Sequence, residues 1–159
     1  MRAVVAFVMV LGMAPLLTAC GPDKNDAMSA IDAAGAGSVT ARPDDHISGD
    51  ERDYQIHVTS QLVLAGNVTF TMTNYGSISH EMLVVKTDIG AGLIPIGADQ
   101  RFNESDPRST VVGEISEYGP GTTKSKTLNL APGNYQLVCN IPDHYGKGMA
   151  IAFKVIAAR

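Results

Sequence analysis

Alternation of apolar and polar positions dominates the chain from Tyr54 onward. Residues 68–73 alternate apolar side chains with threonine, and residues 54–59 alternate in the same way. A period of two residues is typical of half-buried β-strands. The same reasoning predicts further strands at residues 81–86, 111–115, 124–130, 135–139 and 151–155.

Turn residues separate the predicted strands. Gly66-Asn67, residues 74–77 and residues 131–134 are turn signals, and residues 87–110, rich in Gly, Pro, Asp and Asn, predict a long surface connection. Several short strands without any long helical period indicate an all-β domain. We expect an antiparallel Greek-key β-sandwich or barrel.

Residues 1–19 are predicted to be a lipoprotein signal peptide. Arg2 precedes an apolar run over residues 3–17, which as a helix spans only about 22 Å, less than the roughly 30 Å hydrocarbon layer of a bilayer. The run ends in Leu17-Thr18-Ala19-Cys20, which resembles the bacterial lipobox. An ordinary cleavage site with a chance cysteine is the alternative. We expect Cys20 to carry a lipid anchor, which places the protein in a bacterial cell envelope, facing the periplasm or the extracellular side.

The rest of the chain divides into a linker and one domain. Residues 20–49 are crowded with Ala, Gly, Asp and Ser and predict a flexible linker behind the lipidated cysteine. Residues 50–159 are predicted to form a single globular domain, and 45% apolar residues are enough to give it a core. A net charge of -4 and the lack of a basic patch argue against nucleic-acid binding.

The segment between the last two predicted strands carries three potential metal ligands. Cys139, His144 and Met149 follow one another at intervals of five residues. If Cys20 is lipidated, Cys139 has no disulfide partner in an exported protein, although a lone buried thiol can also be only a small apolar group. Two sulfur donors and an imidazole suit copper, and a blue-copper site combines two histidines, one cysteine and a distant axial methionine. The missing histidine is expected to be His80.

These residues carry a resemblance to a known family. The pattern N-x-G-x-x-x-H at residues 74–80, followed by G-x-Y-x-x-x-C-x4-H-x4-M at residues 133–149, is similar to the cupredoxins, the type 1 or blue copper proteins. The C-x4-H-x4-M spacing is most similar to that of rusticyanin, auracyanin and the sulfocyanins. The resemblance covers residues 54–156 and implies one mononuclear type 1 copper ion bound by His80, Cys139, His144 and Met149.

The resemblance also assigns roles to residues around the metal. His144 is expected to bring its ring edge to solvent and to pass electrons to a docked partner. Residues expected to support the ligands or to form the docking rim are Asn74, Glu81, Ile141, Pro142, Asp143 and Tyr145. Two positions depart from the family: Asp143 stands where relatives of this loop often have Gly, and Glu81 stands where many cupredoxins have Asn or Ser.

The function that the resemblance implies is electron transfer rather than catalysis. We expect a membrane-tethered, monomeric carrier that cycles between Cu(I) and Cu(II) and exchanges electrons with a cytochrome, an oxidase or another copper protein. The alternative is a copper-delivery or copper-resistance module without an electron-transfer role. A closed set of four ligands, without methionine or histidine clusters, favours the carrier. A nucleophilic Cys139–His144 pair is a weaker alternative, because Met149 has no role in it.

Overall fold

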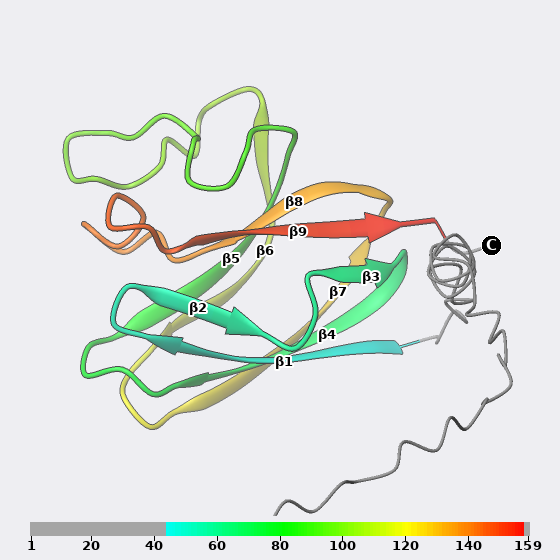
Figure 1. Cartoon of the computed structure of the whole chain (residues 1–159), viewed down its shortest axis with the longest axis horizontal. Coiled ribbons are helices and arrows are strands. Elements are labelled where there is room, and N and C mark those ends of the chain that lie inside the picture. Colours follow the sequence, from blue (N-terminus) through cyan, green and yellow to red (C-terminus); the bar gives the residue numbers. More distant parts are fainter. Residues whose placement is uncertain (1–43, 158–159) are drawn as a thin grey trace, which may run out of the picture. The chain divides into compact units, whose positions relative to one another are not determined.

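Two β-sheets packed face to face build the domain (Figure 1). The computed structural model describes residues 44–157. The strands are β1 (Asp44–Arg52), β2 (Gln55–Val58), β3 (Leu62–Leu64), β4 (Gly66–Asn74), β5 (His80–Thr87), β6 (Ser109–Tyr118), β7 (Thr123–Leu130), β8 (Gly133–Val138) and β9 (Ala150–Ile156). One sheet has the order β2-β1-β4-β7 and the other the order β3-β9-β8-β5-β6. The predicted all-β sandwich is confirmed.

The sheets are mixed rather than purely antiparallel. Consecutive neighbours such as β8 and β9 pair antiparallel, whereas β1 pairs with β4 and β3 pairs with β9 in parallel. Both parallel pairs involve strands from the N-terminal part of the domain. These strands join sheets whose other strands are antiparallel, as in many mixed sheets.

The N-terminal edge of the domain differs from the sequence-based prediction. Strand β1 begins at Asp44, so residues 44–49 are part of the sheet and not of the linker. Gly66 and Asn67, expected to form a turn, are the first residues of β4. The signal peptide, Cys20 and the linker up to residue 43 lie outside the described residues. Within residues 44–157 no helix has the length and apolar character needed to cross a bilayer.

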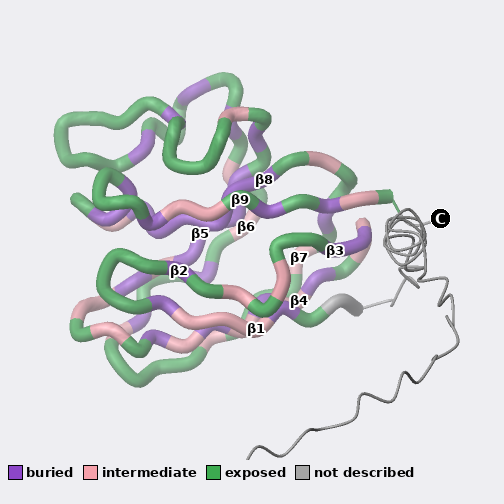
Figure 2. Tube along the Cα trace, in the orientation of Figure 1, coloured by how far each residue is buried: buried purple, intermediate pink, exposed green. Residues whose placement is uncertain are grey.

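The main core lies between the two sheets, where Figure 2 shows the buried segments of both layers. Phe70 and Met72 point inward from β4, and the Phe70 ring packs against Phe153 of β9 with ring centroids 5.5 Å apart. The alternating burial of β4 follows the alternation of apolar residues and threonine in its sequence. Cys139 and Met149 belong to this core, at the end of the sandwich where β8 ends and β9 begins.

The long connection between β5 and β6 covers the outer face of the second sheet. Ile94 and Phe102 from this connection pack on Val85 of β5 and Val138 of β8 in a second buried cluster. Strand β5 is therefore buried on both faces, which explains its unbroken apolar run at residues 82–85. The connection also forms backbone hydrogen bonds with the loop between β8 and β9, which carries His144.

Candidate metal centre

Two loops at one end of the sandwich bring the four predicted ligands to one place. His80 is the first residue of β5, and Cys139 directly follows β8. His144 lies in the loop between β8 and β9, and Met149 is the last residue before β9. Both ends of the loop are thus fixed by the antiparallel pairing of β8 with β9, and His80 is fixed by its pairing with Tyr118 of β6.

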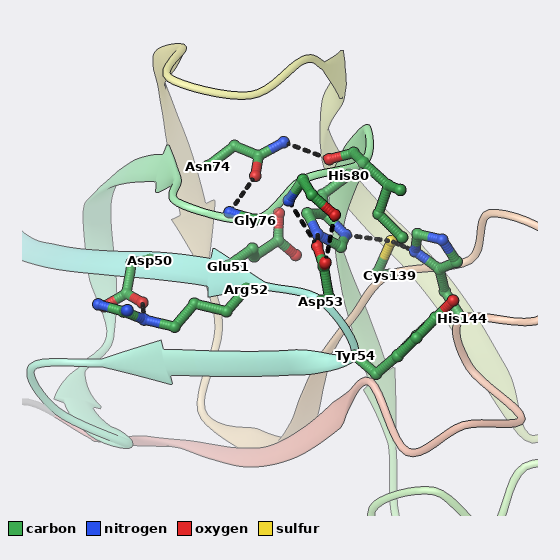
Figure 3. A network of polar contacts seen from close by, with 12 residues as sticks. Asp50, Glu51, Arg52, Asp53, Tyr54, Asn74, Gly76, His80, Cys139 and His144 are labelled. Atoms are coloured by element: carbon green, nitrogen blue, oxygen red, sulfur yellow. Dashed lines mark hydrogen bonds and ion pairs between the residues drawn. The ribbon is translucent and has the colours of Figure 1, made fainter.

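The cysteine sulfur lies between the two imidazole rings. Its Sγ is 3.9 Å from Nδ1 of His80 and 3.2 Å from Nδ1 of His144, and the three ligand atoms all lie within 4.8 Å of one another (Figure 3). Nitrogen and sulfur ligands bind a metal at about 2.0–2.3 Å, so two ligands of one ion lie at most about 4.5 Å apart. Both sulfur–nitrogen distances meet this condition, and the three donor atoms form a group that could hold one metal ion.

The fourth donor is buried with the thiol. The side chains of Met149 and Cys139 are both fully buried in the core between the sheets. The Met149 carbonyl accepts a hydrogen bond from the Cys139 N–H at 3.1 Å, and the Met149 N–H donates to the His144 carbonyl at 3.2 Å. These backbone bonds hold the methionine beside the two ligands that precede it in the loop. The four predicted donors are therefore gathered at one site.

Burial sets the protonation of the donors. It raises the pKa of the Cys139 thiol to about 12 and lowers the pKa of both His80 and His144. At neutral pH the metal-free site therefore holds a thiol and two neutral imidazoles, whose nitrogen lone pairs are free to bind a metal. A metal that binds the thiolate must displace the thiol proton.

The ligand loop is a compact series of turns. The Lys147 N–H donates to the Asp143 carbonyl at 3.0 Å, and the Gly148 N–H donates to the Tyr145 carbonyl at 2.9 Å. Gly148 has a φ of 101°, which only glycine adopts without strain. Gly146 is needed for a different reason, because a Cβ there would come within 2.7 Å of Gln100 in the long connection.

Solved structures of blue copper proteins share this fold. The chain is similar to an auracyanin from Roseiflexus castenholzii, with 21% identity, a TM-score of 0.50, and 73% of this chain and 98% of that chain covered. It is similar to reduced rusticyanin, with 17% identity, a TM-score of 0.53, and 82% and 95% covered. Auracyanin A of Chloroflexus aurantiacus, described as a "blue" copper protein, matches with 19% identity, a TM-score of 0.50, and 71% and 99% covered. The chain has the cupredoxin fold.

Neither protein-family models nor curated protein sequences match the chain. The cupredoxin likeness therefore rests on the structure. Two imidazole nitrogens, a buried cysteine sulfur and a methionine thioether form the set that suits a single type 1 copper ion. The three close donor atoms come from rigid strand ends and a tightly bonded loop, so the cupredoxin domain presents a preorganised site.

Two residues expected to support the ligands form hydrogen bonds close to them. Buried Asn74 holds the loop that precedes His80, because its amide donates to the Ile78 and Tyr118 carbonyls at 2.8 and 3.0 Å and its Oδ1 accepts from the Gly76 N–H at 2.8 Å. The Glu81 N–H donates to Cys139 Sγ at 3.5 Å. Glu81 Oε1 also accepts the N–H of the residue that follows Cys139, at 3.2 Å, so this side chain links the two ligand loops.

Asn140 is a supporting residue that sequence reasoning missed. Its Oδ1 accepts the Phe102 N–H at 2.8 Å, and its Nδ2 donates to Glu104 Oε1 at 2.8 Å. The side chain is almost fully buried and ties the ligand loop to the long connection. The sequence shows only that Asn140 directly follows the cysteine. It does not show that the Asn140 side chain forms hydrogen bonds with Phe102 and Glu104.

The residues expected to form the docking rim differ in their exposure. Pro142 and Asp143 are exposed and Ile141 is half-buried, as a rim requires. Tyr145 is instead buried, with its ring 5.4 Å from that of Phe102 and its hydroxyl accepting the Ile94 N–H at 3.0 Å. The reason is that the long connection covers this side of the loop, so Tyr145 anchors the loop rather than facing a partner.

The turn between β1 and β2 was given no role by the sequence, yet it contacts both histidines. Asp53 Oδ1 lies 3.8 Å from Nε2 of His80, and the Tyr54 ring meets the His144 ring edge-on with centroids 5.4 Å apart (Figure 3). The Nε2 atom of His80 is buried and has no hydrogen-bond partner. Ser77 donates from its N–H and hydroxyl to Asp53, which lowers the pKa of this carboxyl and keeps it charged.

Asp53→Asn is expected to weaken copper binding by about 10–100-fold, the usual effect of removing a polar partner behind a histidine ligand. The carboxylate faces the ring N–H that His80 would carry when its other nitrogen binds a metal, and an amide stabilises that N–H less. Competition with a copper chelator measures the change. Asp50→Asn is the matched control, since Asp50 pairs with Arg52 and contacts no ligand. Equal affinity of both variants and the wild type would show that Asp53 does not support the site.

Proposed function

We propose that this protein is a one-electron carrier that binds one type 1 copper ion through His80, Cys139, His144 and Met149. Copper supplies the one-electron change between Cu(I) and Cu(II), and the chain supplies a site that changes little between the two states. Support comes from the burial of the donors in a cupredoxin fold: the exposed fraction is 0% for His80, Cys139 and Met149 and 6% for His144. A rigid site of this kind keeps rearrangement on electron transfer small.

Burial also favours the carrier over copper delivery. A delivery protein must release its metal to an acceptor, so its donors must be reachable. Here the ligands lie beneath the β1–β2 turn and within a loop that the long connection clamps. Such enclosed ligands suit a carrier, because a carrier must retain its metal in both oxidation states.

The proposed location is the outer side of a bacterial membrane. This part of the proposal depends on the sequence Leu17-Thr18-Ala19-Cys20, which resembles a lipobox with Cys20 as the lipidated residue. A lipid anchor would hold the domain near membrane-bound redox proteins, such as a cytochrome, an oxidase or another copper protein. Stable anchoring takes more than one acyl chain.

Voltammetry of the copper-loaded domain tests the carrier function. The expected result is a strong visible thiolate-to-copper absorption together with reversible one-electron oxidation and reduction, without loss of metal. A coloured protein that loses copper on reduction, or that passes Cu(I) rapidly to a weak chelator, would instead be a copper-delivery module.

Asp143→Gly is expected to raise the reduction potential by about 10–40 mV, the size of one exposed charge interaction. The carboxylate neighbours His144 in the chain and favours the more positive, oxidised metal. Asp143 has a φ of 70°, which glycine adopts freely, so the variant keeps the loop. Potentiometric titration measures the shift, with Asp88→Asn at the opposite end of β5 as the control. An unchanged or lower potential would contradict the role given to Asp143.

A further inference from the structure

Tyr54 packs against His144 and is the more exposed of the two residues. Its ring meets the imidazole edge-on, at an interplanar angle of 82°. His144 is only 6% exposed, whereas Tyr54 is 36% exposed. A protein that approaches this end of the domain therefore meets the tyrosine ring before it can meet the imidazole.

The backbone of Tyr54 is strained to hold this position. Its φ is 65°, in the left-handed region that a bulky residue enters only at a cost of about 1–2 kcal/mol. Glycine or asparagine would relieve the cost at this turn. A strained aromatic residue placed against a metal ligand points to a function for the side chain.

Lys147 also holds the Tyr54 ring. Its Nζ lies 4.3 Å from the centroid of the Tyr54 ring and donates to the Tyr54 hydroxyl at 3.1 Å. The ammonium group of a lysine is attracted to the face of an aromatic ring at this distance. The tyrosine is thus held by two residues of the ligand loop, His144 and Lys147, although it comes from the β1–β2 turn.

We infer that Tyr54, rather than the imidazole edge of His144, is the residue through which electrons pass to and from a docked one-electron redox protein. This inference rests on the proposed function. A bound copper ion would supply the electron in its reduced state, His144 and Tyr54 would form the path out of the domain, and the oxidised centre of the partner would accept it. No bond forms or breaks and no proton moves, because the tyrosine ring serves as a packed bridge and as the central contact.

Shielding of His144 by the Tyr54 ring is tested first in the metal-free protein. Diethyl pyrocarbonate modifies accessible histidines, and mass spectrometry of peptides follows each site separately. The expected result is slow modification of His144 relative to exposed His57 in the wild type, and fast modification in Tyr54→Gly, which removes the ring and relieves the strained backbone. Tyr75→Gly is the matched control, because exposed Tyr75 stacks with Arg52 and contacts no ligand. His144 that reacts equally in wild type and Tyr54→Gly would overturn the inference.

Electron self-exchange between Cu(I) and Cu(II) copies of the protein tests the bridge, with a second copy of the chain as the partner. We expect Tyr54→Gly to slow self-exchange by about fivefold to thirtyfold, the loss typical of removing a tyrosine from the centre of an interface. Tyr54→Phe keeps the ring and should retain the rate, as should Tyr75→Gly. An unchanged or faster rate in Tyr54→Gly, with its visible absorption intact, would overturn this inference alone. A wild-type protein without thiolate absorption would overturn the proposed function, whatever the histidine modification shows.

Discussion

Cys139→Ser is expected to abolish the visible thiolate-to-copper absorption and the reversible redox cycling of the copper-loaded protein. The absorption requires a sulfur-to-metal bond, and Cys139 Sγ is the donor that lies between the two imidazoles at 3.9 and 3.2 Å. Serine keeps the size of the side chain but is a poor ligand for copper. Absorption spectra and voltammograms of both proteins at equal copper content measure the loss.

The control for this substitution is a buried sulfur that is not a ligand. Met82 is almost fully buried in the same core, and Met82→Leu is expected to keep both the absorption and the redox cycling. The serine hydroxyl costs at most about 1–3 kcal/mol of stability in this buried position, so the fold should survive. A Cys139→Ser protein that remains coloured would mean that the thiol is only part of the core.

The metal-free wild-type protein is expected to become less stable as the pH rises from about 5 to about 8. Glu51→Gln is expected to be free of this loss of stability. Glu51 is fully buried, its Oε2 accepts from the Tyr118 hydroxyl, and its Oε1 has no hydrogen-bond partner. Burial raises the pKa of this carboxyl from 4.5 to about 8. The folded protein therefore binds a proton that the unfolded chain releases, which stabilises the fold only at low pH.

The size and sign of this change in stability follow from the pKa of Glu51 in the unfolded chain and its pKa in the folded protein. Its contribution is complete below about pH 4.5, falls by up to about 1.4 kcal/mol per pH unit, and is lost above about pH 8. Urea unfolding should show the wild type losing up to about 5 kcal/mol relative to Glu51→Gln across this range. Exposed Glu117, beside Tyr118 on β6, provides the control: Glu117→Gln should follow the wild type. A constant difference between wild type and Glu51→Gln would contradict a protonated, buried Glu51.

Much of the sandwich could be predicted because its strands are half-buried. Strand β4 alternates apolar residues with threonine, and the same alternation appears in its burial. Strand β1 escaped prediction because its sequence, DDHISGDER, has one apolar residue, Ile47, and no period. Backbone pairing with β2 on one side and β4 on the other holds this polar strand in the sheet, and side-chain patterns do not record such pairing.

The ligands could be predicted and their surroundings could not. Cys139, His144 and Met149 lie close together in the sequence, so their spacing alone indicated a metal loop. Tyr54 covers His144 from a distant turn, and its contact depends on how two sheets meet at one end. Tyr145 shows the converse: the sequence places it beside a ligand, but the long connection buries it.

X-ray absorption spectroscopy at the copper edge tests the central claim most directly. Metal-free protein loaded with one equivalent of copper should show a single kind of site, in which one short copper–sulfur bond accompanies two histidine nitrogens. Cys139→Ser should lose the short sulfur contribution. Copper surrounded only by nitrogen and oxygen in the wild type would contradict the account, because the buried thiol would then not be a ligand.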